Sequence, residues 1–87
     1  EGRLIVSLDL PETLGVAFAA RSAGDRPSKV EVTINGRAAG SIQVETSWGE
    51  GRIEVPQALW ARGPNIVTLR SDRRVDVDRV SFLRPER

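Results

Sequence analysis

Two tryptophans are the side chains in this sequence best suited to hold a ligand against an aromatic ring. Trp48 lies in a loop rich in glycine, and Trp60 lies on a short segment with helical character. An exposed indole can stack on an apolar surface such as the face of a sugar ring. The same ring can instead fill the core, where deleting a buried Trp costs about 3–5 kcal/mol. Each tryptophan is therefore a candidate for ligand stacking and also for core packing.

Three carboxylates near the end of the chain form the second candidate cluster. Asp76 and Asp78 are two residues apart on a predicted strand, and Asp72 lies in the turn before it. Their hard oxygen atoms suit Ca²⁺, which takes about 6–8 oxygen ligands. Four arginines lie close by and would neutralise these carboxylates as surface ion pairs: Arg70, Arg73, Arg74 and Arg79. We therefore predict ion pairs here, with no metal and no other cofactor.

The composition excludes several classes of catalysis. The chain has no His and no Cys, which rules out Ser-His-Asp triads, thiol nucleophiles, disulfides and Cys/His zinc sites within it. Glycosidic cleavage by two carboxylates requires one raised pKa in a walled cleft. Glu45, Glu50 and Glu54 lie instead on predicted solvated loops and strands of a thin domain. We predict that the chain is not an enzyme.

Charge and length limit the partners. The 13 basic and 12 acidic residues give a formal net charge of +1 and are interspersed along the chain. Without a basic face, we expect no nucleic-acid partner. No apolar run approaches the ~20 residues of a membrane span. The 87 residues suffice for one domain covering 1–87. Because the chain begins at Glu1 without Met, we expect it to be a processed product or a piece cut from a larger protein.

The elements that must position these side chains are strands, because hydrophobicity alternates with a period of two almost throughout. Pro56–Gly63 is the exception and predicts one or two helical turns. Many short strands separated by Gly/Pro turns predict a compact antiparallel β-sandwich, with a small closed barrel as the alternative. The seven predicted strands cover residues 4–10, 16–20, 29–35, 40–44, 52–55, 65–70 and 75–83.

Local signals refine this prediction. Asn35-Gly36 predicts a two-residue hairpin, since a type I′ turn needs positive φ at both positions. Gly40 predicts a bulge or bend in the returning strand. The apolar phase changes within 75–83, which predicts a β-bulge near Asp78–Arg79. We expect five apolar side chains to be almost fully buried between the sheets: Phe18, Val32, Ile34, Leu69 and Phe82.

From Lys29 onward, a series of motifs occurs in a recognisable order. The series comprises VEVTING at Val30–Gly36, GSIQV at Gly40–Val44, Trp48 ahead of a strand ending in Val55-Pro56, Leu59 through Gly63-Pro-Asn65, and VDRVSF at Val77–Phe82. This order resembles the galactose-binding-domain-like jelly rolls, a superfamily that includes carbohydrate-binding modules and accessory β-domains. The resemblance covers about two-thirds of the chain and implies a jelly-roll sandwich.

The resemblance also implies a function. It points to a non-catalytic carbohydrate-binding or accessory module of a larger extracytoplasmic, cell-envelope or carbohydrate-active protein, whose partner is a polysaccharide or glycan. In such domains the Trp at the position of Trp48 closes one end of the core, and Leu stands where this chain has Trp60. Trp60 is therefore the favoured surface platform. Trp48, Gln43 and Arg79 are further candidate ligand-binding residues. The alternative is a structural or protein-interaction sandwich that packs against a parent enzyme, as a neighbouring domain of the same protein, and binds no sugar.

Overall fold

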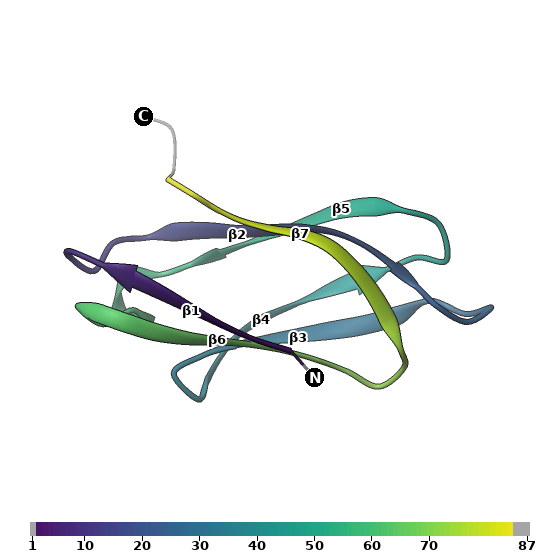
Figure 1. Ribbon diagram of the computed structural model, residues 1–87, viewed down its shortest axis with the longest axis horizontal. Helices are drawn as coiled ribbons and strands as arrows, with labels where there is room; N and C mark the ends of the chain where they lie inside the picture. Colours follow the sequence, from purple (N-terminus) through teal and green to yellow (C-terminus); the bar gives the residue numbers. More distant parts are fainter. Residues whose placement is uncertain (1, 85–87) are drawn as a thin grey trace.

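The computed structural model describes residues 2–84, which form seven strands in two antiparallel sheets (Figure 1). The predicted β-sandwich is confirmed, and the closed-barrel alternative is wrong because the two sheets do not join. The four-stranded sheet has the order β1-β6-β3-β4, with bounds Gly2–Leu8, Gly63–Ser71, Ser28–Ile34 and Arg37–Val44. The three-stranded sheet has the order β5-β2-β7, with bounds Gly49–Val55, Leu14–Ser22 and Val75–Leu83.

The core lies between the two sheets and is built from alternate residues of each strand. Phe18 on β2 and Val32 and Ile34 on β3 are buried as predicted. The prediction of near-complete burial is wrong for Leu69 and Phe82, which are only partly buried and pack against the margin of the core. Leu69 lies beside an opening between the sheets, and Phe82 lies near the end of the edge strand β7.

The turn and both irregular positions agree with the local signals. Asn35 has φ 52° and Gly36 has φ 82°, which confirms the two-residue hairpin between β3 and β4. Ala39 is the extra residue where β4 slips register next to Gly40, because Val32 pairs with Gly40 and Thr33 pairs with Ala38. Asp78 is the extra residue in β7, where Ala19 pairs with Arg79 and Ala20 with Val77. Both predicted bulges are therefore confirmed.

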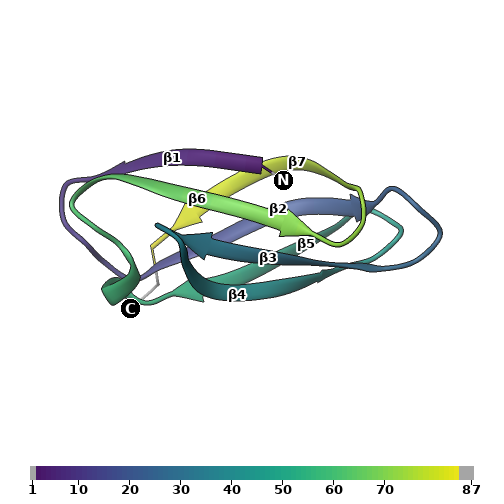
Figure 2. The same cartoon turned by 90° about the horizontal axis from the view of Figure 1, so that it is seen from below.

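The two long sides of the sandwich differ. On one side β4 packs against β5, and two glycines allow the close approach: Gly51 lies against Ile42, and Gly40 lies against Ile53. On the other side stand β1 and β7, the remaining edge strands of the two sheets. Figure 2 shows β1 and β4 at opposite edges of their sheet. The sandwich is therefore closed along β4 and β5 and more open along β1 and β7.

The predicted short helical segment is confirmed as a single turn. Within Pro56–Gly63 only the 3₁₀ turn η1 (Gln57–Leu59) forms, and Trp60 follows it in extended conformation. Among the residues that the structure describes, no helix is long enough or apolar enough to span a membrane. Strand β5 begins at Gly49, three residues before the predicted start, and this extension brings Trp48 to the edge of the three-stranded sheet.

Candidate functional site

Trp60 lies inside the protein, so the expectation that it is the exposed platform is wrong. Its side chain is 5% exposed, and its indole Nε1 donates a hydrogen bond to the Val55 carbonyl oxygen at 3.3 Å. Its ring meets Phe82 edge to face, with centroids 6.4 Å apart and planes at 80°. The 3₁₀ turn before it directs the indole over one end of the core, the role that the resemblance assigned to Trp48.

Trp48 is the exposed tryptophan. It is 51% exposed and lies directly before Gly49, the first residue of β5. Alternate residues of β5 face outward, and Trp48 continues that outward series at the end of the strand. The guanidinium carbon of Arg21 lies 5.1 Å from the centroid of its ring, within the range of a cation–π contact. The strand alternation therefore explains why Trp48 faces solvent.

A shallow groove runs along the outer face of the three-stranded sheet. Its floor is Ala17 and Ala19, which alternate with the inward-facing Val16 and Phe18 on the central strand β2. Ala17 pairs with Arg52 on one side and Ser81 on the other, and Ala19 pairs with Glu50 and Arg79. Small side chains flanked by taller ones leave a hollow of about 430 Å³. The small residues of β2 therefore create the groove.

Polar side chains form the walls of this groove. The carboxylates of Glu50 and Asp78 and the side chains of Arg79 and Ser81 line it, together with Leu83. Beyond the floor at one end, the Arg52 guanidinium lies over Gly15, so closely that a side chain at that glycine would collide with it. The groove therefore combines an apolar floor with hydrogen-bond donors and acceptors of both charges.

At the other end of the groove, Arg21 joins Trp48 to β7. Its Nε donates to the Asp76 carboxylate at 3.2 Å, and both side chains are partly exposed. Arg21 and Asp76 are direct cross-strand partners in the β2–β7 ladder. Trp48, Arg21 and Asp76 therefore form a row across the sheet, next to the row of Glu50, Ala19 and Arg79.

The four candidate ligand-binding residues do not form one site. The structure places Trp48 and Arg79 on the same outer face of the three-stranded sheet. Gln43 is exposed on β4 of the other sheet, and Trp60 is buried at the end of the core. Only Trp48 and Arg79 therefore remain together as candidates.

The three aspartates lie in different surroundings. Asp72 accepts a hydrogen bond from the Ser28 hydroxyl at 2.8 Å, and this bond is the main reason that the pKa of Asp72 lies below its ordinary value. Asp76 pairs with Arg21, and Asp78 lines the groove at the bulge of β7. Within residues 2–84, no three His, Cys, Asp or Glu side chains come together to hold a metal ion.

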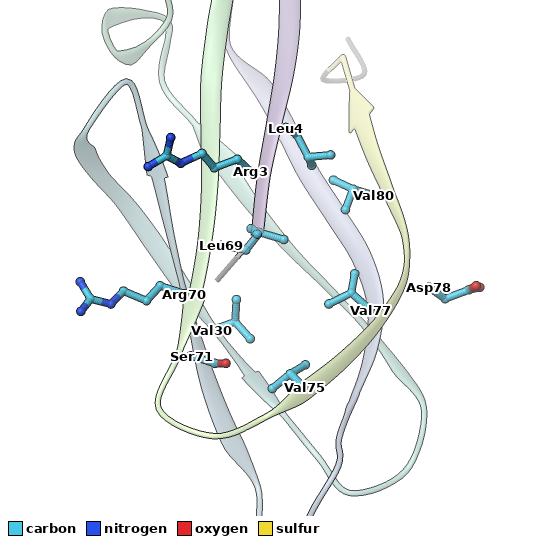
Figure 3. A pocket seen from close by; sticks show the side chains of 11 residues that line it. Arg3, Leu4, Val30, Leu69, Arg70, Ser71, Val75, Val77, Asp78 and Val80 are labelled. Carbon is cyan, nitrogen blue, oxygen red and sulfur yellow. The ribbon is translucent and has the colours of Figure 1, made fainter.

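A second hollow lies on the open side of the sandwich. Figure 3 shows side chains from β1, β3, β6 and β7 that point toward one space between the sheets, with a volume of about 530 Å³. Arg3, Arg70 and Asp78 point away from it. The side chains around the space are aliphatic: Leu4, Val30, Leu69, Val75, Val77 and Val80. The interior of this cleft is therefore mainly aliphatic, although Ser71 also lines it.

Sequence analysis missed the floor of the groove and Arg21. The alternation of Ala17 and Ala19 with Val16 and Phe18 was visible within the predicted strand 16–20, whose two outward residues are both small. What could not be seen was that longer side chains on the neighbouring strands would flank these positions, because the pairing depends on tertiary structure.

A scan against protein-family models, a search of curated proteins and a search of solved structures find no match to this chain.

Proposed function

We propose that this chain is a non-catalytic carbohydrate-binding module of a larger extracytoplasmic or carbohydrate-active protein. The observation that carries the proposal is the groove over Ala17 and Ala19, which has Trp48 exposed in the adjoining row of the sheet. The extracytoplasmic location rests on the resemblance to galactose-binding-like jelly rolls. The site differs from the one expected from the sequence, since Trp48 takes the role expected of Trp60.

The chemistry of the groove suits a hydroxyl-rich ligand. Alanine methyl groups on the floor match the C–H face of a sugar ring, while Glu50 and Asp78 can accept hydrogen bonds from its hydroxyl groups. Arg79 can donate to ring or hydroxyl oxygens, and Ser81 can do both. Because acidic and basic side chains are mixed here, the groove favours a neutral glycan over a strongly charged one.

Binding of this kind should be weak, because the groove is shallow and its polar side chains are solvated. Stacking on Trp48 adds apolar contact, although Arg21 already occupies part of the ring. A neutral glycan makes no ion pair with the protein, so salt should change the affinity little. Chelators should have no effect on binding that relies on the groove alone.

An NMR titration with neutral and acidic oligosaccharides tests the proposal. Backbone amides of β2, β5 and β7 near the groove should shift at millimolar concentrations of a neutral oligosaccharide. Ala19→Leu should abolish these shifts by filling the floor, and Trp48→Ala should weaken them. Thr33→Leu is the matched control, because Thr33 is a partly buried position in the other sheet and its substitution should leave binding unchanged.

Two results would overturn this proposal. One is the absence of any shift with every oligosaccharide at millimolar concentration. The other is a set of shifts that survives Ala19→Leu in a protein whose other amide resonances keep their positions, since the ligand would then bind elsewhere.

The second candidate function is a structural or protein-interaction sandwich that packs against a neighbouring domain and binds no sugar. Exposed apolar side chains on the four-stranded sheet favour it, since Ile5 is 74% exposed and Ile66 is 45% exposed. These residues lie on the other sheet from the groove. Failure of the titration together with binding through this apolar surface would favour the second candidate.

A further inference from the structure

The free edge of β1 is a regular strand that is open to pairing. Among the described residues, β1 has a hydrogen-bonded neighbour on one side only, β6. Its register with β6 runs without interruption from the Gly2–Leu69 pair to the Leu8–Gly63 pair. Arg3 is the one charged residue within Gly2–Leu8. A regular, mainly apolar edge strand without Lys or Pro is the kind of edge that joins another strand.

The other edge strands within residues 2–84 carry features that hinder such pairing. β4 is bulged at Ala39, and β7 is bulged at Asp78. β5 keeps a regular register, but it places three exposed charged side chains along its outer face: Glu50, Arg52 and Glu54. Bulges and charges are common devices against edge-to-edge association. β1 has no bulge, and Arg3 is its single charged residue.

The hydrogen bonds of Ile66 show which backbone groups of β1 are free. The Ile66 carbonyl oxygen accepts from the Asn35 N–H at 2.8 Å, and its own N–H donates to Asn35 Oδ1 at 2.9 Å. Both groups therefore point toward β3. Ile5 lies directly opposite Ile66 on β1, so its N–H and carbonyl point to the free edge. By alternation along the strand, the same holds for Arg3 and Ser7.

These residues also present their side chains to solvent. Arg3, Ile5 and Ser7 are exposed, while the residues between them pack toward the core. Ile5 and Ile66 are cross-strand partners, 74% and 45% exposed, and form an apolar pair on the outer face of the sheet. The free backbone groups and the apolar pair therefore lie together at one edge.

We infer that this edge binds a second copy of the same chain, with the two β1 strands antiparallel about a twofold axis at Ile5. Ile5 is the central residue of Gly2–Leu8, so this register pairs the whole strand. Arg3, Ile5 and Ser7 then form the hydrogen-bonded pairs with the partner copy. The two four-stranded sheets become one continuous sheet.

The side chains of β1 are self-complementary in this register. Arg3 faces Ser7 of the partner subunit, so the single charge of the strand meets a neutral hydroxyl and no two arginines oppose each other. Ile5 faces Ile5 of the partner subunit, and Ile66 of each copy extends the row. An apolar strip therefore crosses the junction without interruption. This fit to itself is the reason to name a second copy as the partner.

Charge substitutions at Ser7 test both the dimer and its register. In analytical ultracentrifugation over a range of concentrations, the unaltered chain should form a weak dimer. Ser7→Glu should tighten it and Ser7→Arg should weaken it, each by roughly tenfold in the dissociation constant, because the twofold axis creates two contacts with Arg3. Both effects should shrink at high salt. Ser41→Arg is the matched control, an exposed Ser on the opposite edge strand β4, and should change nothing.

Amide hydrogen exchange gives a second readout that does not depend on mutation. The amides of Arg3, Ile5 and Ser7 should exchange more slowly as the protein concentration rises, while that of Val6 is protected at every concentration. A monomer at roughly 1 mM would overturn the inference. A dimer that responds equally to Ser7→Glu and Ser7→Arg would overturn it as well, because another surface would then join the copies.

Discussion

Arg21 stacks on the indole of Trp48, with its guanidinium carbon 5.1 Å from the ring centroid, while its Nε bonds to Asp76 at 3.2 Å. One arginine therefore connects an exposed aromatic ring on the β5 side of the sheet to a carboxylate on β7. A planar guanidinium can stack and hydrogen-bond at the same time, whereas an ammonium group cannot provide the same flat surface. The position of Trp48 at the end of the groove thus depends on a residue of β2.

Removing the carboxylate that holds Arg21 should loosen Trp48. Asp76→Asn should increase the quenching of Trp48 fluorescence by neutral acrylamide, while the buried Trp60 stays unquenched. The stability should fall by less than about 1 kcal/mol, because exposed ion pairs and cation–π contacts are worth little. Asp78→Asn is the control, with the same charge change on the same strand. Equal quenching in the two variants would show that Asp76 does not hold the arginine.

The Asn35-Gly36 turn should tolerate no β-branched residue at its second position. Gly36 has φ 82°, and the space around it is open, so backbone strain is the sole penalty for Gly36→Val. We expect a loss of about 1–2 kcal/mol in the free energy of unfolding, measured by urea denaturation. Gly24→Val is the matched control, because Gly24 also has open space but no positive φ. Similar midpoints for both variants would contradict the role of φ.

Asn65 should be among the polar residues most sensitive to substitution. Its side chain is fully buried, its Oδ1 accepts from the Ala61 N–H at 2.7 Å, and its Nδ2 donates to the Ala61 carbonyl at 2.9 Å. It also bonds to Val6 and Asn35, which ties the loop before β6 to β1 and to the hairpin. Asn65→Ala should cost more than about 3 kcal/mol, because several buried groups lose partners together.

Gln43, whose side-chain amide is exposed, is the control for Asn65. Gln43→Ala should stay within about 0.5 kcal/mol of the unaltered protein, as is usual for surface substitutions. Urea denaturation followed by circular dichroism measures both variants. An Asn65→Ala protein with an unchanged midpoint would show that the hydrogen bonds of Asn65 add no net stability.

Asp72 should make stability depend on acid pH. The Ser28 hydroxyl is the largest cause of its lowered pKa, and desolvation opposes that effect more weakly. A lowered pKa in the folded state means that folding favours the carboxylate. The contribution is therefore present above the ordinary carboxyl pKa of about 4 and is lost as the pH falls through the lower folded value. Ser28→Ala should raise the pKa of Asp72, which carboxyl NMR measures directly.

The loss of stability caused by Ser28→Ala should also depend on pH. Ser28→Ala should melt below the unaltered protein at pH 7, and the two melting temperatures should converge as the pH falls well below 4. Ser22→Ala is a useful comparison, because Ser22 is also buried but its hydroxyl has no hydrogen-bond partner in the described structure. Its removal should cost nothing and can stabilise by up to about 1 kcal/mol. A gap between Ser28→Ala and the unaltered protein that stays constant with pH would exclude Asp72 as its source.

Most of the fold follows from local patterns that the sequence displays directly. Alternation predicts strands, Asn35-Gly36 predicts the hairpin, and the phase change near Asp78 predicts the bulge, because each depends on a few neighbouring residues. The extents of burial at Leu69 and Phe82 depend instead on what covers them. β7 is an edge strand, and the side next to β1 is open, so apolar residues there are only partly enclosed. Periodicity along one strand cannot show which side of a sandwich stays open.

The roles of the two tryptophans could not be assigned from the sequence for a related reason. Trp48 was expected in the core because its distance from the Val55-Pro56 strand end matched a known pattern. The strand actually begins earlier, at Gly49, and its alternation turns Trp48 outward. Trp60 follows a turn so short that its direction depends on the packing of Phe82 and Val55. The orientation of Trp48 thus depends on the earlier start of β5, and the orientation of Trp60 depends on a tertiary contact.

β4 and β5 approach each other closely because residue 51 is a glycine. A methyl group at this position would overlap the Cγ2 methyl of Ile42. Gly51→Ala should therefore push the layers apart locally. The distance between the two sheets along β4 and β5 is thus set by the absence of one carbon atom at Gly51.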